Sequence, residues 1–116
     1  MKTKLQKLNT KIQKLKERER VKSREFIERE LTKLVEQFPE IRVRYEHNDN
    51  DYFIEITKGE IYFQNDEYHK WDMNMWNGFV KQFPTQGLCI VSETDLFPFE
   101  NVDFTLYGKN RPPTIN

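Results

Sequence analysis

The chain has 116 residues, a single cysteine and as many basic as acidic side chains, so its formal net charge at pH 7 is zero. This length suits one domain, and one cysteine excludes an intramolecular disulfide and a cysteine-rich zinc site. No run approaches the roughly 20 apolar residues of a membrane span, and charged residues rather than an apolar segment follow Met1. We therefore expect a cytoplasmic protein that contacts no membrane.

Charge is distributed unevenly along the chain. Residues 1–24 hold ten Lys or Arg and two Glu, a local net charge of +8, whereas residues 41–116 hold seven basic and twelve acidic side chains. A basic segment of this kind is typical of a contact with nucleic acid or an acidic surface, and also of a solvated helix face. Both interpretations stay open here.

Residues 3–38 contain neither Pro nor Gly and predict helix up to Pro39, because the residue before a proline avoids the helical conformation. A two-heptad apolar stripe with the 3-4-3 spacing of a coiled coil is formed by Leu5, Leu8, Ile12 and Leu15. A second stripe, offset by about one position, begins at Ile27. The pattern predicts one long helix or two helices joined near residues 18–23, with a basic helical arm over 1–22 and a single α+β domain over 23–108.

Residues 41–64 predict a three-stranded antiparallel meander. Its first hairpin pairs Val43 with Ile54 across a polar turn at residues 47–51, and a two-residue turn at Lys58-Gly59 leads into the third strand. Both turns place the same apolar side chains on one inward face, with Ile56 opposite Ile61 and Ile54 opposite Phe63. The opposite, outward face carries four side chains that we expect to bind a partner: Arg42, Arg44, Phe53 and Tyr62.

The rest of the chain predicts a second helix over about residues 67–83, capped by Asn65 or Asp66. Its apolar arc is broad, and Trp76 and Val80 belong to it. Asp72 falls inside the same arc by helical phase. It is either a residue at the rim of the buried face, favoured near the helix start by the helix dipole, or a candidate buried polar residue that needs a hydrogen-bond donor.

Two strands and a tail complete the predicted elements. The run at residues 88–91 is apolar on both faces and predicts a central or doubly covered strand, in which Cys89 is an inert core side chain. A last strand is expected over residues 104–107, and residues 109–116, which include Pro112 and Pro113, predict an extended tail.

The predicted fold is therefore α+β with the order α-β-β-β-α-β-β and one antiparallel sheet with helices packed on one face. This order resembles that of the type III secretion chaperone fold and its relatives, small cytosolic proteins that bind other chains. The resemblance covers most of the chain and rests on element order. It implies a protein-binding function, although the final helix of that family has no counterpart after residue 107.

The sequence offers no catalytic, cofactor or metal motif. None of the four glycines belongs to a phosphate-binding pattern, and the two histidines, His47 and His69, are predicted on a turn and at a helix start, apart from any ligand cluster. The turn at residues 47–51 is rich in oxygen donors but lacks the spacing of a calcium-binding loop. We expect a protein that is not an enzyme.

The leading functional prediction is a non-catalytic protein-interaction module of the adaptor, chaperone or immunity-protein kind, encoded by a bacterium or a phage. It would bind a protein partner, or a second copy of itself as a dimer, through the arm and the outward sheet face. The alternative is a nucleic-acid-binding accessory protein that uses Lys7, Lys11, Lys14 and Arg18. The arm lacks aromatic side chains for base stacking, which favours helix packing.

Overall fold

The computed structural model describes residues 3–95 and 97–111, so residues 112–116 of the predicted tail lie outside the described residues. The elements, in chain order, are α1 (Lys4–Gln37), β1 (Arg42–Asn48), β2 (Asp51–Thr57), α2 (Gly59–Gln64), α3 (Asp66–Gln82), β3 (Gly87–Ser92), the short 3-10 helix η1 (Glu93–Asp95) and β4 (Phe104–Tyr107). None of the described helices combines the length and the apolar character needed to cross a bilayer.

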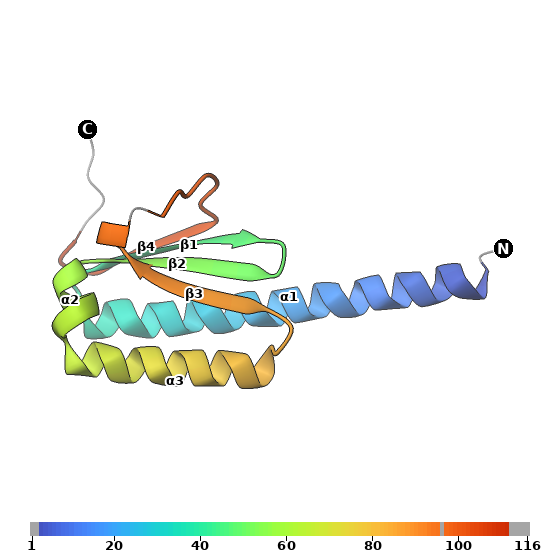
Figure 1. The fold of residues 1–116 in the computed structure, drawn as a ribbon, viewed down its shortest axis with the longest axis horizontal. Coiled ribbons are helices and arrows are strands. Elements are labelled where there is room, and N and C mark those ends of the chain that lie inside the picture. The colour runs from blue at the N-terminus through green and yellow to red at the C-terminus, as the bar shows by residue number, and fades with distance from the viewer. Residues whose placement is uncertain (1–2, 96, 112–116) are drawn as a thin grey trace.

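The long N-terminal helix α1 is continuous, which is one of the two predicted arrangements. It begins with a capping box, in which the Thr3 hydroxyl accepts the N–H of Gln6 at 3.1 Å and Gln6 Oε1 accepts the N–H of Thr3 at 2.9 Å. Its last residue is Gln37, and Phe38 caps this end directly before Pro39. The C-terminal half of α1 lies against the sheet beside α3, and the N-terminal half extends beyond both (Figure 1).

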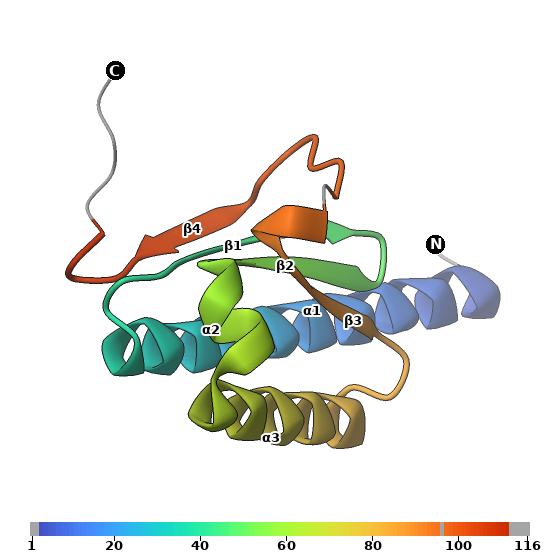
Figure 2. The ribbon, with the colours of Figure 1, turned by 60° about the vertical axis from the view of Figure 1, so that its left-hand side comes forward.

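The four strands form one sheet in the order β3-β2-β1-β4. Strand β1 is antiparallel to β2 and to β4, whereas β2 and β3 are parallel. Helices α1 and α3 cover one face of this sheet (Figure 2). The α+β class with helices on one face is confirmed, but a purely antiparallel sheet is wrong, because α2 and α3 carry the chain back so that β3 starts at the same end as β2.

The core lies between this sheet face and the two helices. Its side chains with no exposed surface come from both layers: Ile27, Leu31, Leu34, Ile41, Val43, Tyr52, Ile54, Ile56, Tyr68 and Phe79. Aromatic rings supply much of the buried area, as expected for a chain poor in aliphatic residues.

The first hairpin forms on the predicted face with a shorter turn. Asn48 pairs with Asp51, so that Val43 pairs with Ile56 rather than with Ile54. The tight turn is possible because Asp49 adopts a left-handed conformation, with φ of 54°, which Asp tolerates better than most residues. The register therefore shifts by two residues, and a shift of two leaves every side chain on its predicted face.

The predicted third strand of the meander is wrong, because residues 59–64 form α2. Ile61 is buried as expected, but Phe63, predicted to face inward, is 54% exposed. The place beside β2 is taken by β3. Among the described elements, residues 59–64 have no neighbouring strand to pair with. As a helix that leads directly to the Asn65 cap of α3, they form their backbone hydrogen bonds within the segment.

Strand β3 lies at the edge of the sheet, so the prediction of a central or doubly covered strand is wrong. Leu88 and Ile90 are half-buried against the core, whereas Cys89 is exposed rather than a core side chain. Helix α3 is confirmed with its Asn65 cap. The predicted apolar arc is too broad, because Trp76 and Val80 of α3 are 49% and 39% exposed.

Gly108, directly after β4, is expected to be intolerant of a side chain. Its N–H donates to the Ile41 carbonyl at 2.7 Å, and an added Cβ would collide with the Pro39 carbonyl and lie 2.9 Å from the Ile41 oxygen. Gly108→Ala should lower the free energy of unfolding by about 1–3 kcal/mol, as measured by urea denaturation. Gly59→Ala is the control, because a Cβ there meets only ordinary contacts. Equal effects would contradict the prediction.

Candidate interaction surface

The arm, which we define structurally as residues 3–22, presents an uncovered apolar stripe. The exposed fractions are 67% for Leu5, 53% for Leu8, 40% for Ile12 and 51% for Leu15. We call these four side chains the seam. The first buried side chain of α1 is that of Ser23, whose hydroxyl hydrogen-bonds the buried Tyr52 hydroxyl at 2.9 Å. The body of the protein therefore begins to cover α1 immediately after the arm.

The middle of the seam, Leu8 and Ile12, continues the side of α1 that packs against α3. Phe26 and Glu30 follow Leu8 and Ile12 by 18 residues, which is five turns at 3.6 residues per turn. By the same spacing, Leu5 aligns with Ser23, which faces the sheet, and Leu15 aligns with the exposed Lys33. Phe26 packs against two rings of the α3 segment, 6.1 Å from Phe79 and 5.9 Å from Phe83. The Glu30 carbonyl accepts the indole N–H of Trp71 at 3.3 Å.

Helix α3 ends at Gln82, and α1 continues well past that end (Figure 1). Along the C-terminal half of α1, the α3 side is occupied by a packed helix. Along the arm, the same side is apolar and is exposed to solvent. The seam is therefore an apolar stripe of α1 that none of the described elements covers.

Positive charge flanks the seam. The candidate nucleic-acid residues Lys7, Lys11, Lys14 and Arg18 are all exposed. Within residues 3–95 and 97–111, the one ion pair in the arm joins Arg20 to Glu17 at 3.5 Å, and both side chains are largely exposed. Such surface pairs contribute little to stability, so most of the positive charge of the arm stays uncompensated.

The outward face of the sheet is less open than the sequence predicts. Glu55 is buried there between two arginines: Arg42 Nη2 lies 3.0 Å and Arg44 Nε 2.8 Å from Glu55 Oε1. Arg44 Nη2 also donates to Glu55 Oε2 at 3.0 Å, which completes a bidentate pair. These arginines are therefore used to neutralise a buried carboxylate of their own chain.

The segment between η1 and β4 packs onto the same face. Phe53 stacks on Phe97 with ring centroids 4.6 Å apart, and the Arg44 guanidinium lies 4.6 Å from the Phe99 centroid. The Glu46 carboxylate accepts the backbone N–H of Glu100 at 2.9 Å. Of the residues predicted for this face, Phe53 is thus half-buried by intramolecular contacts.

Tyr62 does not lie on the sheet at all, because it belongs to α2. Its hydroxyl donates to the Ile90 carbonyl at 3.0 Å, and its ring packs 5.6 Å from that of Tyr68. Tyr62 therefore fastens α2 to β3 and α3. The structure brings the four seam residues together, but it separates Tyr62 from Arg42, Arg44 and Phe53.

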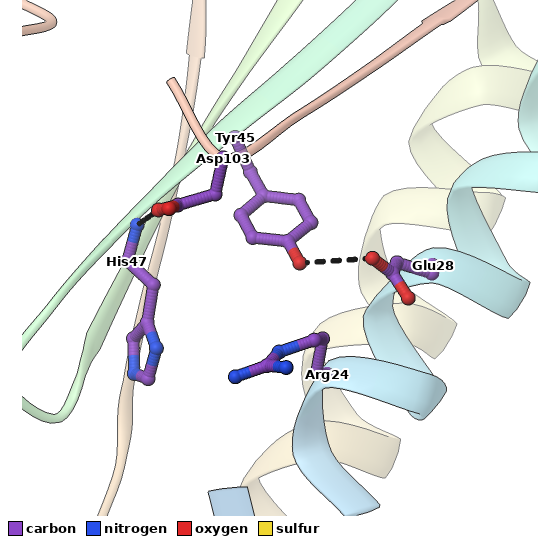
Figure 3. A pocket seen from close by; sticks show the side chains of 5 residues that line it. All are labelled: Arg24, Glu28, Tyr45, His47 and Asp103. Atoms are coloured by element: carbon purple, nitrogen blue, oxygen red, sulfur yellow. Dashed lines mark hydrogen bonds between the residues drawn. The ribbon is translucent and has the colours of Figure 1, made fainter. Parts of the chain in front are cut away.

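A polar cavity of about 350 Å³ lies beside the part of α1 that directly follows the arm. It is lined by Arg24 and Glu28 from α1, Tyr45 and His47 from β1, and Asp103, which precedes β4 (Figure 3). The Tyr45 hydroxyl donates to Glu28 Oε1 at 3.0 Å, and Asp103 Oδ2 accepts the backbone N–H of His47 at 2.7 Å. The Arg24 guanidinium points into the space between them (Figure 3).

Burial sets the protonation of this cavity. It raises the pKa of the Tyr45 hydroxyl, and the neighbouring Glu28 carboxylate raises that pKa further, so Tyr45 remains a donor. Burial and the Arg24 charge lower the pKa of His47 below its usual value, with Asp103 opposing. The His47 ring stacks 4.0 Å above Tyr52. The lining thus carries one positive charge, that of Arg24, and two carboxylates, those of Glu28 and Asp103.

Asp72, the candidate buried polar residue, is half-buried on α3 and lines no part of this cavity. Burial raises the pKa of its carboxyl group, and His69 opposes the shift. The His69 ring hydrogen-bonds the Tyr62 carbonyl at 3.0 Å. Among the residues that the structure describes, no three His, Cys, Asp or Glu side chains are grouped so that they could hold a metal ion.

Sequence reasoning did not find the cavity, because its walls come from three segments that are far apart in the chain. Arg24 and Glu28 are separated from Asp103 by more than half of the sequence, and no local spacing connects them. The seam, in contrast, is local, and its spacing alone was sufficient to find it.

Comparison with known proteins found no matching family model, no matching curated protein and no matching solved structure. The function must therefore be argued from the geometry and charge of the chain itself.

The lowered pKa of His47 predicts a pH-dependent stability. Because the folded state holds this pKa below that of the unfolded chain, the unfolded chain binds the proton more readily. The contribution of His47 is complete above the unfolded pKa of about 6.5 and is lost as the pH falls below it.

The free energy of unfolding of the wild type should therefore fall more between about pH 7.5 and about pH 5.5 than that of His47→Gln. Urea denaturation at both pH values measures the difference. The same substitution at the other histidine, His69→Gln, controls for removal of a titrating side chain. A His47→Gln variant with the full wild-type decrease would contradict this account.

Proposed function

We propose that this chain is a non-catalytic cytoplasmic protein-interaction module, adaptor-like, chaperone-like or immunity-like, that binds a protein partner through the seam. The supporting observation is a row of four apolar side chains, 40–67% exposed, on one side of a projecting helix. Contiguous apolar surface in contact with water is typical of interaction sites. Apolar side chains at heptad spacing are suited to packing against another helix.

The attachment of the arm to the body supports this function. An isolated helix of two heptads is marginal in water, because its first turn is costly to form. Here the C-terminal half of α1 is fixed by Ile27, Leu31 and Leu34, which have no exposed surface. The arm extends a helix that is already formed, so a partner loses less free energy in ordering it.

The outer sheet face contributes less to the proposal than the seam does. Arg42 and Arg44 pair with Glu55, and Phe53 stacks on Phe97. A partner on this face would compete with contacts that the chain already makes within itself.

Replacing two seam residues should abolish partner binding and leave the fold intact. Leu8→Asn with Ile12→Asn removes the apolar character of the seam, and Lys7→Asn with Lys14→Asn is a matched control with the same two Asn residues. Because all four side chains are exposed, both variants should stay within about 0.5 kcal/mol of each other in free energy of unfolding.

Affinity capture from the native host, followed by mass spectrometry, compares the two variants with the wild type. We expect proteins that are retained by the wild type and the lysine variant and lost by the seam variant. If the seam variant retains the same proteins as the wild type, the proposed function is wrong.

Nucleic-acid binding is the second candidate, and the net charge of +8 over residues 1–24 favours it. It makes the opposite prediction for the same two variants. Lys7→Asn with Lys14→Asn should weaken binding of labelled duplex and single-stranded oligonucleotides, and the seam variant should not, because counterion release depends on charge. Titration at about 50 mM salt, where such binding is strongest, decides the question, and no binding by the wild type there would exclude this function.

A further inference from the structure

We propose that the seam binds an amphipathic helix whose apolar stripe is flanked by Glu and Asp, and that a second copy of this chain is disfavoured as its occupant. This inference rests on the proposed function, because it names the chemistry of the partner that the seam takes. Two observations support it: the charges beside the seam indicate the chemistry of the partner, and the position of α3 indicates where the partner lies.

The positions that border the seam carry positive charge without any negative charge. With Leu5 and Ile12 at positions a and Leu8 and Leu15 at positions d of two heptads, the bordering positions are e and g. In this chain they are occupied by Lys4, Asn9, Lys11, Lys16 and Arg18, all of which are exposed. Side chains at e and g meet those of the partner helix and select it by charge.

A second copy would therefore meet like charges in either orientation. In a parallel pair, Lys11 at position g faces Lys16 at position e of the second copy. In an antiparallel pair, g meets g, so Lys and Arg again face Lys and Arg, and e meets e, where Asn9 and Lys16 supply no negative charge. Such contacts disfavour pairing, whereas Glu or Asp at the same positions of a partner would form ion pairs with all four cations.

The end of α3 indicates where this partner lies. Phe26 and Glu30 of α1 contact the α3 segment through Phe79, Phe83 and Trp71, and Leu8 and Ile12 of the seam are on that same side of α1. A helix on the seam would continue the line of α3 beyond Gln82, end to end with it (Figure 1). The partner helix would thus pack on the side of α1 on which α3 already packs.

Charge reversal at the bordering positions tests this in the full chain. Lys11→Glu with Lys16→Glu places Glu at two of the four cationic positions that border the seam and leaves the seam itself unchanged. Lys7→Glu with Lys14→Glu is the matched control. It makes the same change in charge at the two c positions of the heptads, which do not border the seam. Sedimentation velocity at tens of micromolar and about 150 mM salt follows each protein alone and in equal mixtures with the wild type.

We expect the wild type alone to be monomeric and the mixture with Lys11→Glu, Lys16→Glu to form a heterodimer. The mixture with the outer control should associate at least about tenfold more weakly. Adding Leu8→Asn and Ile12→Asn to the acidic variant should abolish the heterodimer, because the apolar contact would be lost while the charges remain.

Three results would overturn the inference. A wild-type dimer that is lost in the seam variant would make a second copy the occupant and leave the proposed function standing. Equal association of both charge-reversed variants would show unspecific attraction. Monomers in every mixture would show that acidic flanks do not suffice, and the capture experiment would then judge the proposed function separately.

Discussion

The structure depends on the burial of the second half of α1 beneath the sheet. Ile27, Leu31 and Leu34 are fully enclosed and hold a 34-residue helix of which only part belongs to the core. Helical structure propagates from a packed segment at little cost once its first turns exist. The buried half of α1 therefore holds the arm as a helix, and this helix displays the apolar stripe and the positive charge of the arm to solvent.

The molecule has two positively charged regions, the outer sheet face and the arm, and they differ in whether the chain supplies negative charge beside them. On the outer sheet face, Arg42 and Arg44 are used to neutralise the buried Glu55, and a carboxylate buried without such partners would be costly. On the arm, lysines stand in water beside apolar side chains, and the chain supplies almost no counter-charge. The first region stabilises the fold of the chain itself, and the second holds charge that the chain does not use within itself.

The sequence predicts best what depends on local periodicity. The long helix, the capped α3 and the inward face of the first hairpin follow from patterns within a few turns or residues, as does the seam. Contacts between distant segments were beyond such patterns. The alternation of Ile61 and Phe63 favoured a strand, yet β3 took the place beside β2, and residues 59–64 closed into a helix instead. The cavity around Arg24 and Asp103 forms where α1, β1 and the residue before β4 come together, and no local spacing in the sequence predicts that contact.

Because α1 has no hinge between the seam and the core, the direction of the seam depends on the number of residues that separate them. One residue inserted near residues 17–22 would turn the arm by about 100° around the helix axis and lengthen it by about 1.5 Å. The seam would then no longer face the α3 side, whereas seven inserted residues would restore its direction to within about 20°. The length of this segment can therefore change without turning the seam only by numbers of residues close to whole helical turns, such as about 7, 11 or 18.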